Sequence, residues 1–324
     1  MKKVIVMLFV FIMLLTGCAV QEAVPEITLL PSSTREPVAT STAIPTPTPY
    51  KLTIEHIVKK GSVKEGKFSF HVVFPDPVFA YVVAMQMGKD VNDMTSMEEL
   101  AAYTGELSVD VTSLDNAEGE SVTVHSLEGI GYLTGITSFS NAKNDVEVIP
   151  DEIGKLGNLT EMNLLKSYDL KRISPEIGKL SNLKILNAAL TQLETLPSEI
   201  GQLRNLEELD VTATKLTAIP DEIGNVASLK KLDIHSNEIK FLPDSICNLT
   251  ELEELDASYL KLTTLPENIG NMMKLSKINL FGNDVKKLPD SMRNLKSLTY
   301  LNVYDNYNLD EGYKDMFDTS VWQV

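Results

Sequence analysis

The chain has 324 residues, of which 43% are hydrophobic and 6% aromatic, and its formal net charge is −16 at pH 7. This length allows a sizeable core, but the charge argues against nucleic acid or an anionic membrane surface as partner, because both are negatively charged themselves. A protein partner with a neutral or basic surface is easier to accommodate.

The first 17 residues have the pattern of a secretory signal peptide. Lys2 and Lys3 give a positive start, and Val4 to Leu15 is an unbroken apolar run. This run is shorter than the roughly 20 residues that a membrane-spanning helix needs. We therefore expect the protein to be exported.

The signal ends in Leu15-Thr16-Gly17-Cys18, which resembles the lipobox of bacterial lipoproteins. The resemblance implies that residues 1–17 are removed and that the Cys18 thiol carries the fatty acids of a lipid anchor. It also implies a bacterial source and a place at the cell membrane, facing the extracellular side or the periplasm. The alternative is an ordinary signal peptide that happens to contain a cysteine. With Cys18 lipidated, Cys247 is expected to be a lone thiol.

Residues 18–50 have the composition of an extended linker. They are rich in Ser and Thr and contain six prolines, at positions 25, 31, 37, 45, 47 and 49. Such a segment buries too little apolar surface to offset the entropy lost on folding. At ~3.1 Å per residue, roughly thirty residues form a stalk of at most about 90 Å.

Residues 51–125 are expected to contain a small β element followed by two helices. Apolar residues alternate in two short runs, which are Leu52, Ile54 and Ile57, then Phe68, Phe70 and Val72. The first helix is predicted after Asp76 and Pro77 and closes at Gly88, because an acid and a proline open helices and glycine ends them. The second is predicted from Thr95 or Ser96 to about Tyr103.

From residue 126 to 306 one pattern of about two dozen residues recurs. Its anchor is an aliphatic residue before proline, and five anchors are spaced 23 apart (for example 219 − 196 = 23), namely Leu196, Ile219, Leu242, Leu265 and Leu288. Ile173 and Ile149 extend the series upstream, with one single-residue insertion near Tyr168. A fixed period of this length indicates a solenoid.

Each copy contains both secondary-structure periods. The Leu-x-Leu segment alternates with period two and predicts a short strand, whereas the Pro-acid-acid-Ile-Gly segment predicts one helical turn. Proline is expected at the first helical position, and the following glycine where it tolerates positive φ. Stacked copies share a continuous core of Leu, Ile and Val. The expected fold is an α/β solenoid with a curved parallel sheet.

The motif Leu-x-x-Leu-x-Leu-x-x-Asn-x-Leu followed by Leu-Pro-x-x-Ile-Gly resembles the leucine-rich repeat family. The resemblance implies a horseshoe with a parallel concave sheet, capped at both ends. A degenerate first copy at Ile130, with the two helices before it, resembles the amino-terminal cap of bacterial surface proteins of the internalin kind. Residues 307–324, with Tyr313, Phe317 and Trp322, are expected to close the other end.

The buried asparagine of the family is kept in only part of the repeats. It is present at Asn237, Asn283 and Asn306 and replaced at four positions, namely Ser167, Thr191, Thr214 and Leu260. Hydroxyl groups can make some of the same hydrogen bonds. Leu260 cannot, so the pattern leaves its turn unpredicted.

The strand residues that point away from the leucines form three predicted columns. The first is Glu161, Ile185, Glu208, Lys231, Glu254, Lys277 and Tyr300; the second is Asn163, Asn187, Asp210, Asp233, Asp256, Asn279 and Asn302; the third is Leu165, Ala189, Thr212, His235, Ser258, Phe281 and Tyr304. Neighbouring strands lie ~4.8 Å apart, so members of one column are contact neighbours.

Seven of these side chains, toward the carboxy-terminal half, are our candidate partner-binding residues: Asp210, Asp233, His235, Asp256, Phe281, Tyr300 and Tyr304. Exposed aromatic rings beside carboxylates are typical of interface hot spots. The alternatives are that the charged column satisfies itself, that the Asx column is structural and that the rings pack under the carboxy-terminal cap.

No catalytic motif stands out, and no pair of the four histidines has metal-ligand spacing. We therefore expect no enzyme activity, no cofactor and no metal. The predicted function is binding of a protein partner through the concave face of a lipid-anchored surface protein. The alternatives are a carbohydrate-binding adhesin and a structural envelope scaffold without a specific ligand.

Overall fold

The computed structural model describes residues 63–64, 66–109, 122–317 and 321. The chain divides into two units, Met1–Pro49 and Tyr50–Val324, and every described residue lies in the second. The expected signal peptide, Cys18, the linker and the first alternating run lie outside the described residues. Within those residues, no helix is long and apolar enough to cross a membrane.

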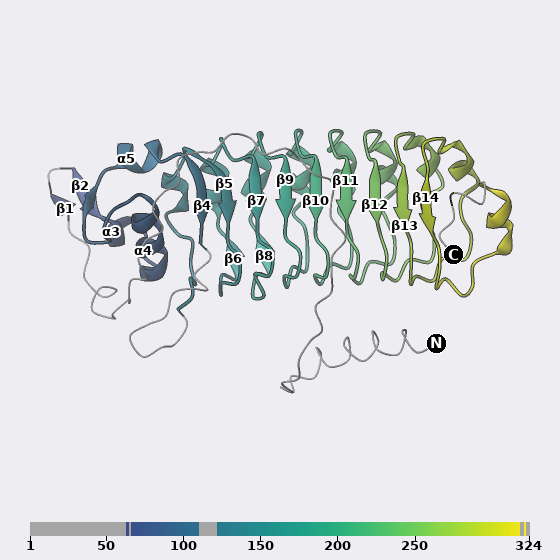
Figure 1. Cartoon of the computed structure of the whole chain (residues 1–324), viewed down its shortest axis with the longest axis horizontal. Helices are drawn as coiled ribbons and strands as arrows, with labels where there is room; N and C mark the ends of the chain where they lie inside the picture. The colour runs from purple at the N-terminus through teal and green to yellow at the C-terminus, as the bar shows by residue number, and fades with distance from the viewer. Residues whose placement is uncertain (1–62, 65, 110–121, 318–320, 322–324) are drawn as a thin grey trace, which may run out of the picture. The chain divides into compact units, whose positions relative to one another are not determined.

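The concave face is a parallel sheet of nine strands that lie side by side in chain order (Figure 1). These strands are β4 Gly105–Ser108, β5 Ile136–Ser140, β7 Glu161–Asn163, β9 Ile185–Asn187, β10 Glu208–Asp210, β11 Lys231–Asp233, β12 Glu254–Asp256, β13 Lys277–Asn279 and β14 Tyr300–Asn302. Leu209 pairs with Leu232, which in turn pairs with Leu255, so each strand is in register with the equivalent residues of the next repeat. The predicted columns and the horseshoe fold are confirmed.

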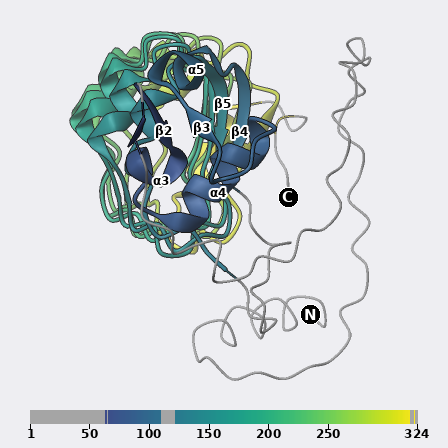
Figure 2. The same ribbon diagram turned by 90° about the vertical axis from the view of Figure 1, so that its left-hand side faces the viewer.

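A second, two-stranded sheet pairs β6 Val148–Ile149 with β8 Arg172–Ile173. The predicted helical turns are 3-10 helices, stacked on the side of each coil opposite the strands (Figure 2). Eight occur in the repeats, at Ile130–Tyr132, Asp151–Lys155, Pro175–Lys179, Ser198–Gln202, Asp221–Asn225, Asp244–Asn248, Ile269–Asn271 and Asp290–Asn294.

Proline occupies a different position in most of these turns from the one we predicted. Only Pro175 lies inside its helix, after the capping hydroxyl of Ser174. In five other repeats the proline is itself the cap, and its carbonyl accepts the first hydrogen bond, as Pro197 does from the Ile200 amide at 3.0 Å. The missing N–H of proline costs nothing there either, since that group lies before the helix.

The repeat glycines are needed for close packing, and the expectation of positive φ was wrong. Gly201 and Gly224 lie inside the 3-10 helices and do not have positive φ. A Cβ at Gly224 would lie 2.4 Å from the Ser245 carbonyl oxygen of the next coil. Glycine therefore lets neighbouring turns approach one another. Cys247 takes this position one repeat later and is buried.

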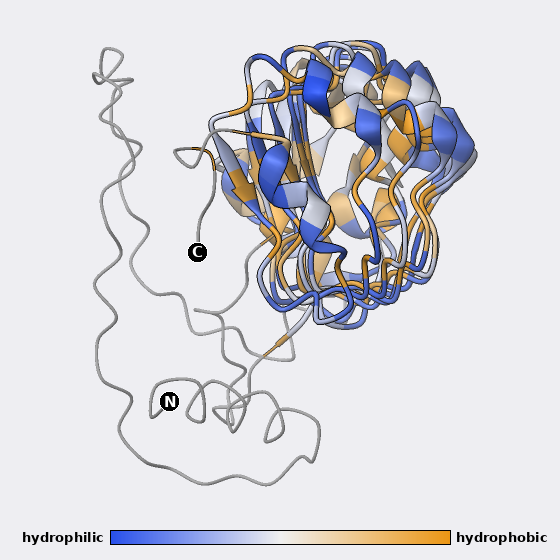
Figure 3. Cartoon of the chain, turned by 90° about the vertical axis from the view of Figure 1, so that its right-hand side faces the viewer, coloured by the Kyte–Doolittle hydropathy of each residue, from blue (hydrophilic) through white to orange (hydrophobic). Residues whose placement is uncertain are grey.

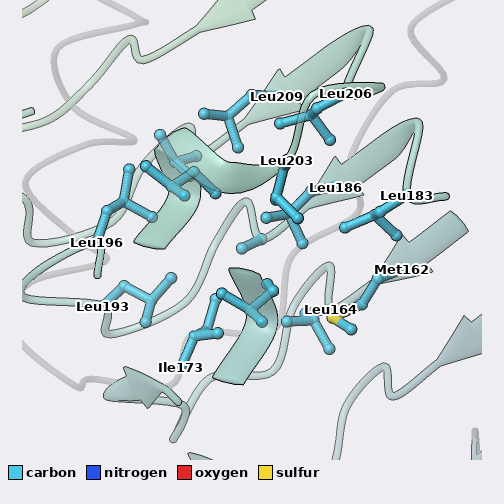
Figure 4. Close-up of a cluster of buried hydrophobic side chains, with 14 of the residues drawn as sticks. Met162, Leu164, Ile173, Leu183, Leu186, Leu193, Leu196, Leu203, Leu206 and Leu209 are labelled. Atoms are coloured by element: carbon cyan, nitrogen blue, oxygen red, sulfur yellow. The ribbon is translucent and has the colours of Figure 1, made fainter. Parts of the chain in front are cut away.

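Aliphatic side chains from successive coils fill the interior. Met162, Leu186 and Leu209, from three neighbouring strands, point into the same space (Figure 4). The hydrophobic segments of successive coils lie over one another along the unit (Figure 3). Leu209 is 1% exposed and Leu232 is fully buried, as predicted. At about 25 cal/mol for each Å² of apolar surface removed from water, this shared core stabilises repeats that could not fold alone.

The asparagine ladder forms where it was predicted. Asn237 donates from its side-chain nitrogen to the Val211 and Ile234 carbonyls, both at 2.9 Å, and its oxygen accepts from the Leu216 amide at 3.1 Å. The turn at Leu260 also forms, because Tyr259 adopts the same positive φ as its counterpart Ser236. Loss of the asparagine therefore leaves the path of the chain unchanged.

The amino-terminal cap differs in part from the expected β element (Figure 2). A three-stranded sheet is present, with β1 Val63–Lys64, β2 Lys67–Ser69 and β3 Met94–Thr95. Phe70 and Val72, which we expected in a strand, lie in the short helix α3 Phe70–Val73. Phe70 is fully buried there as part of the hydrophobic core, so tertiary packing outweighs the local alternation.

The two predicted helices are present. Helix α4 is Pro77–Gln86, and the Asp76 carboxylate caps it by accepting from Val78 and Phe79. The other oxygen of Asp76 accepts from the amides of His125 and Ser126, which ties the cap to the first repeat. Helix α5 is Met97–Ala102, capped by the Ser96 hydroxyl.

The carboxy-terminal end is closed by a last 3-10 helix, Glu311–Asp315. Tyr313 and Phe317 pack against the core, as do Met316 and Val321. Arg293 donates to the Asp315 carbonyl at 2.9 Å and so attaches this segment to the last full repeat. Trp322 lies outside the described residues.

Candidate functional site

The second column has a structural role along its whole length. In every repeat from β7 to β14 its Asn or Asp oxygen accepts from the amide two residues later, as Asp210 does from Thr212 at 2.9 Å. These hydrogen bonds shape the chain where each strand ends. Asn and Asp are interchangeable for this purpose, so the three aspartates add charge that the turn itself does not require.

Asp233 and His235 form an ion pair at the centre of the concave face. The His235 Nδ1 atom lies 2.7 Å from the Asp233 carboxylate, and the Thr212 hydroxyl donates to the same carboxylate at 2.9 Å. The His235 side chain is 33% exposed and the Asp233 side chain 19%. Their local geometry follows from the strand end, which brings residues two apart into contact.

The pair shifts the pKa of both groups. The hydrogen bond that His235 donates to Asp233 raises the pKa of His235 against the opposing effect of burial, and the charges of Asp233, Asp256 and Asp210 add to the rise. Burial alone would raise the pKa of Asp233, but the hydrogen bond and charge of His235 and the Thr212 hydroxyl outweigh it and lower that pKa. Each partner therefore stabilises the charged form of the other.

Asp256 lies next to this pair on β12. Its carboxylate accepts from the Ser258 hydroxyl at 2.5 Å and from the Asn279 side chain at 2.8 Å. Asp233, His235 and Asp256 each offer a possible metal-ligand atom, and these atoms lie within 4.8 Å of one another. The predicted columns place these three residues near one another, but metal-ligand spacing along the chain did not indicate the group, because Asp256 comes from the next repeat.

The first column is only partly self-satisfied. Lys277 contacts Glu254 at 2.5 Å across β13 and β12. Glu208 and Lys231 are paired in register, but no ion pair joins them among the described contacts. Exposed pairs of this kind contribute little to stability, ~0.2–1 kcal/mol each.

Three aromatic rings, Tyr259, Phe281 and Tyr304, form a row at the carboxy-terminal end of the concave face, which we call the aromatic row. The Tyr259 and Phe281 ring centroids are 4.8 Å apart in an edge arrangement, and those of Phe281 and Tyr304 are 5.7 Å apart and stacked. Tyr259 is 52% and Tyr304 62% exposed. Tyr259 joins the row because its backbone turns there at φ 49°.

A hollow of about 430 Å³ lies over β11 to β14, beside the aromatic row. Its polar lining is Lys231, Asp233, Glu254, Asp256, Lys277, Asn279 and Tyr300. The structure thus gathers Asp233, Asp256 and Tyr300 around one depression, with His235 hydrogen-bonded to Asp233. Phe281 and Tyr304 stand in the row, and Asp210 lies one strand before the hollow.

The one described cysteine has no features of a nucleophile. Cys247 is buried on the 3-10 side of its coil, and burial raises the pKa of its thiol to about 11, with the charge of Asp244 adding to the rise. The thiol therefore stays protonated near neutral pH. What the described concave face offers is charge, hydrogen-bonding groups and exposed rings for recognition.

The repeats of this chain are similar to those of known proteins. A family model described as a leucine-rich repeat region matches residues 161–261. A leucine-rich repeat protein of Leptospira interrogans is 31% identical, with a TM-score of 0.52, and the match covers 62% of this chain. The chain spans 59% of the length of that Leptospira protein. A search of curated proteins gave no match.

Two internalins of Listeria monocytogenes share the fold. InlF is 20% identical with a TM-score of 0.55, and the match covers 74% of this chain and 75% of that one. InlC2 is 23% identical with a TM-score of 0.57, and the match covers 73% of this chain and 97% of that one. The predicted resemblance is confirmed: the chain contains a leucine-rich repeat region and takes the fold of bacterial leucine-rich repeat proteins.

Proposed function

We propose that the carboxy-terminal half of the concave face binds a protein partner with a neutral or basic surface. Leucine-rich repeat regions generally bind proteins. The observation that supports this face most strongly is the aromatic row, in which Tyr304 is 62% exposed beside half-buried carboxylates. Large rigid rings bury much area on binding and lose little conformational entropy.

The rings are not part of the carboxy-terminal closure. Tyr313, Phe317 and their neighbours pack against the end of the core, whereas Tyr304 stacks on Phe281 and stays exposed. This arrangement supports binding over capping. It also weighs against a purely structural scaffold, because an exposed row of rings contributes less to stability than a buried one.

The stacking favours a protein partner over a carbohydrate. A sugar ring binds an aromatic platform by lying on an open ring face, but the facing sides of Phe281 and Tyr304 cover each other. The ring edges and the outward-facing side of such a stack suit the irregular apolar side chains of a protein. Carbohydrate binding is retained as the alternative outcome of the experiment below.

Partner capture by single-residue variants tests this function. Proteins cross-linked to the chain on intact cells are identified by mass spectrometry, and capture is then measured for Tyr304→Ala and Tyr300→Ala. Tyr168→Ala is the matched control, since Tyr168 is 54% exposed but lies near the insertion in an early repeat. We expect loss of capture with unchanged melting temperature for Tyr304→Ala. Unchanged capture, or capture of glycan only, would refute protein binding at this face.

We further propose that the protein is held at a bacterial cell surface by lipid on Cys18, as the Leu15-Thr16-Gly17-Cys18 segment predicts. Hydrophobic burial of the acyl chains would supply the membrane attachment. In cells given a fatty-acid analogue, the wild type should carry the label and Cys18→Ala should be unlabelled and either released or left uncleaved. A labelled, membrane-bound Cys18→Ala protein would contradict the anchor.

A further inference from the structure

The hollow beside the aromatic row has a negative charge that its own lysines do not balance. Asp233, Glu254 and Asp256 line the hollow with Lys231 and Lys277, so with His235 neutral the charge of the lining is 2 − 3 = −1. Glu208 and Asp210, on the neighbouring strand β10, bring the charge of this part of the concave face to −1 − 2 = −3. Lys277 is already paired with Glu254. The concave face therefore complements a cation from outside.

The acids nearest the centre are close enough for one cation to contact both. Asp233 and Asp256 pair in register on β11 and β12, and their carboxylates lie within 4.8 Å of each other. Two like charges at this separation repel each other, and where His235 beside Asp233 is neutral, a shared cation removes the repulsion. Tyr300, on β14, lines the other end of the hollow, two strands along from Asp256.

Along the chain, one residue separates the lining of the hollow from the aromatic row. Asn279 lines the hollow and Phe281, two residues later, belongs to the row. Phe281 lies just beyond the end of β13, and its amide donates to the Asn279 side-chain oxygen at 3.2 Å, so the row adjoins the hollow. Side chains on one face of an extended peptide repeat every ~7 Å, so a single peptide segment can reach both places.

We propose that the hollow and the aromatic row together bind an extended segment of the partner in which an arginine and an apolar side chain are separated by one residue. The guanidinium contacts Asp233 and Asp256, and the apolar side chain packs on Phe281 and Tyr304. Arginine suits this hollow better than lysine because its planar fork can hydrogen-bond two carboxylates at once. This inference rests on the proposed function and specifies its partner.

Defined peptides test the inference on the full chain in detergent micelles. The probes are fluorescein-labelled Gly-Ser-Arg-Thr-Phe-Ser-Gly and its Phe-Thr-Arg counterpart, each with a copy in which neutral citrulline replaces arginine. Fluorescence anisotropy is measured with EDTA present. We expect at least one arginine peptide to bind, and its citrulline copy to bind roughly tenfold more weakly.

Two matched variants test where the arginine of the peptide binds. Asp256→Asn removes one charge but keeps the turn, because asparagine already makes the same hydrogen bond at Asn163, Asn187 and Asn279. This variant should bind the arginine peptide about tenfold more weakly than the wild type does. Glu161→Gln removes an exposed concave charge outside the hollow and should leave binding within about twofold.

Three results would overturn the inference. The first is equal binding of the arginine and citrulline peptides, and the second is no binding of the arginine peptide in either residue order. The third is binding that is lost in EDTA and restored by zinc, which would assign Asp233, His235 and Asp256 to a metal. Partner capture that still depends on Tyr304 in any of these cases would leave the proposed function standing. If partner capture also does not depend on Tyr304, both the inference and the proposed function are refuted.

Discussion

At the residue scale, neighbouring positions on one strand differ sharply in what they contribute to stability. Leu209 is 1% exposed, whereas Glu208 faces solvent. We expect Leu209→Ala to lower the free energy of unfolding by about 2 to 5 kcal/mol, because it leaves a cavity in a packed core. Glu208→Ala should cost less than about 1 kcal/mol. Urea denaturation measures both, and similar midpoints would contradict the assignment of strand faces.

The Asp233 and His235 pair gives stability a defined dependence on pH. Because the pKa of His235 is raised above 6.5, the stability it contributes is present below pH 6.5 and is lost as pH rises through the folded-state value. Because the pKa of Asp233 is lowered below 3.8, its contribution is present above pH 3.8 and is lost as pH falls through the folded-state value. The pair therefore stabilises most between these limits.

Thermal melts of wild type and His235→Gln across pH 4 to 9 measure this effect. We expect the wild type to melt higher at pH 5, and the difference to shrink as pH rises and His235 loses its proton. Asp145 and His125, a more exposed pair with a 3.8 Å separation, offer a control in His125→Gln, for which little change is expected. A difference that grows toward pH 9 would contradict the assigned pair.

The sequence predicted which outward residues are neighbours within a column, but not the contacts between one column and the next. Alternation with period two is enough to place Asp233, His235 and Asp256 on the concave side. The contact between His235 and Asp233 depends on how the chain turns after the strand, and Tyr259 enters the aromatic row through a positive φ that no residue pattern announces. Those features come from backbone geometry beyond the strand.

At the element scale, the close approach of neighbouring 3-10 helices explains the repeated glycine. A Cβ at Gly224 would lie 2.4 Å from the Ser245 carbonyl oxygen, whereas one at Gly157 would meet nothing within 4 Å. We expect Gly224→Ala to destabilise by about 1 to 3 kcal/mol through overpacking. Gly157→Ala should be neutral or slightly stabilising, by up to about 1 kcal/mol. Equal unfolding midpoints for the two would contradict the packing role.

Position 247 carries a natural substitution of this glycine. Cys247 replaces the glycine, and the next 3-10 helix, Ile269–Asn271, is three residues long where its neighbour Asp244–Asn248 has five. The sequence showed the replacement, and the structure shows that the 3-10 helix of the next coil is the shorter of the two.

At the scale of the whole molecule, the repeat period was sufficient to predict the solenoid, because each coil packs mainly on its two neighbours. The cap was less predictable, since strand β4 owes its place to pairing with β5. The Gln86 side chain of α4 accepts from the Ser108 amide at 3.1 Å and donates to the Ser108 carbonyl, which covers the outer edge of that strand. Protecting an open sheet edge is a general need, but the residue that does so is set by tertiary contacts.

The recognition role of the concave face is tested most directly by placing the photo-crosslinker benzoylphenylalanine at single positions of the chain on intact cells. Position 304 lies in the aromatic row, position 161 on the early concave face and position 225 on a 3-10 helix opposite the strands. We predict a partner adduct from position 304 and none from positions 161 and 225. Adducts from position 225, with none from position 304, would show that the partner binds the other side of the coil.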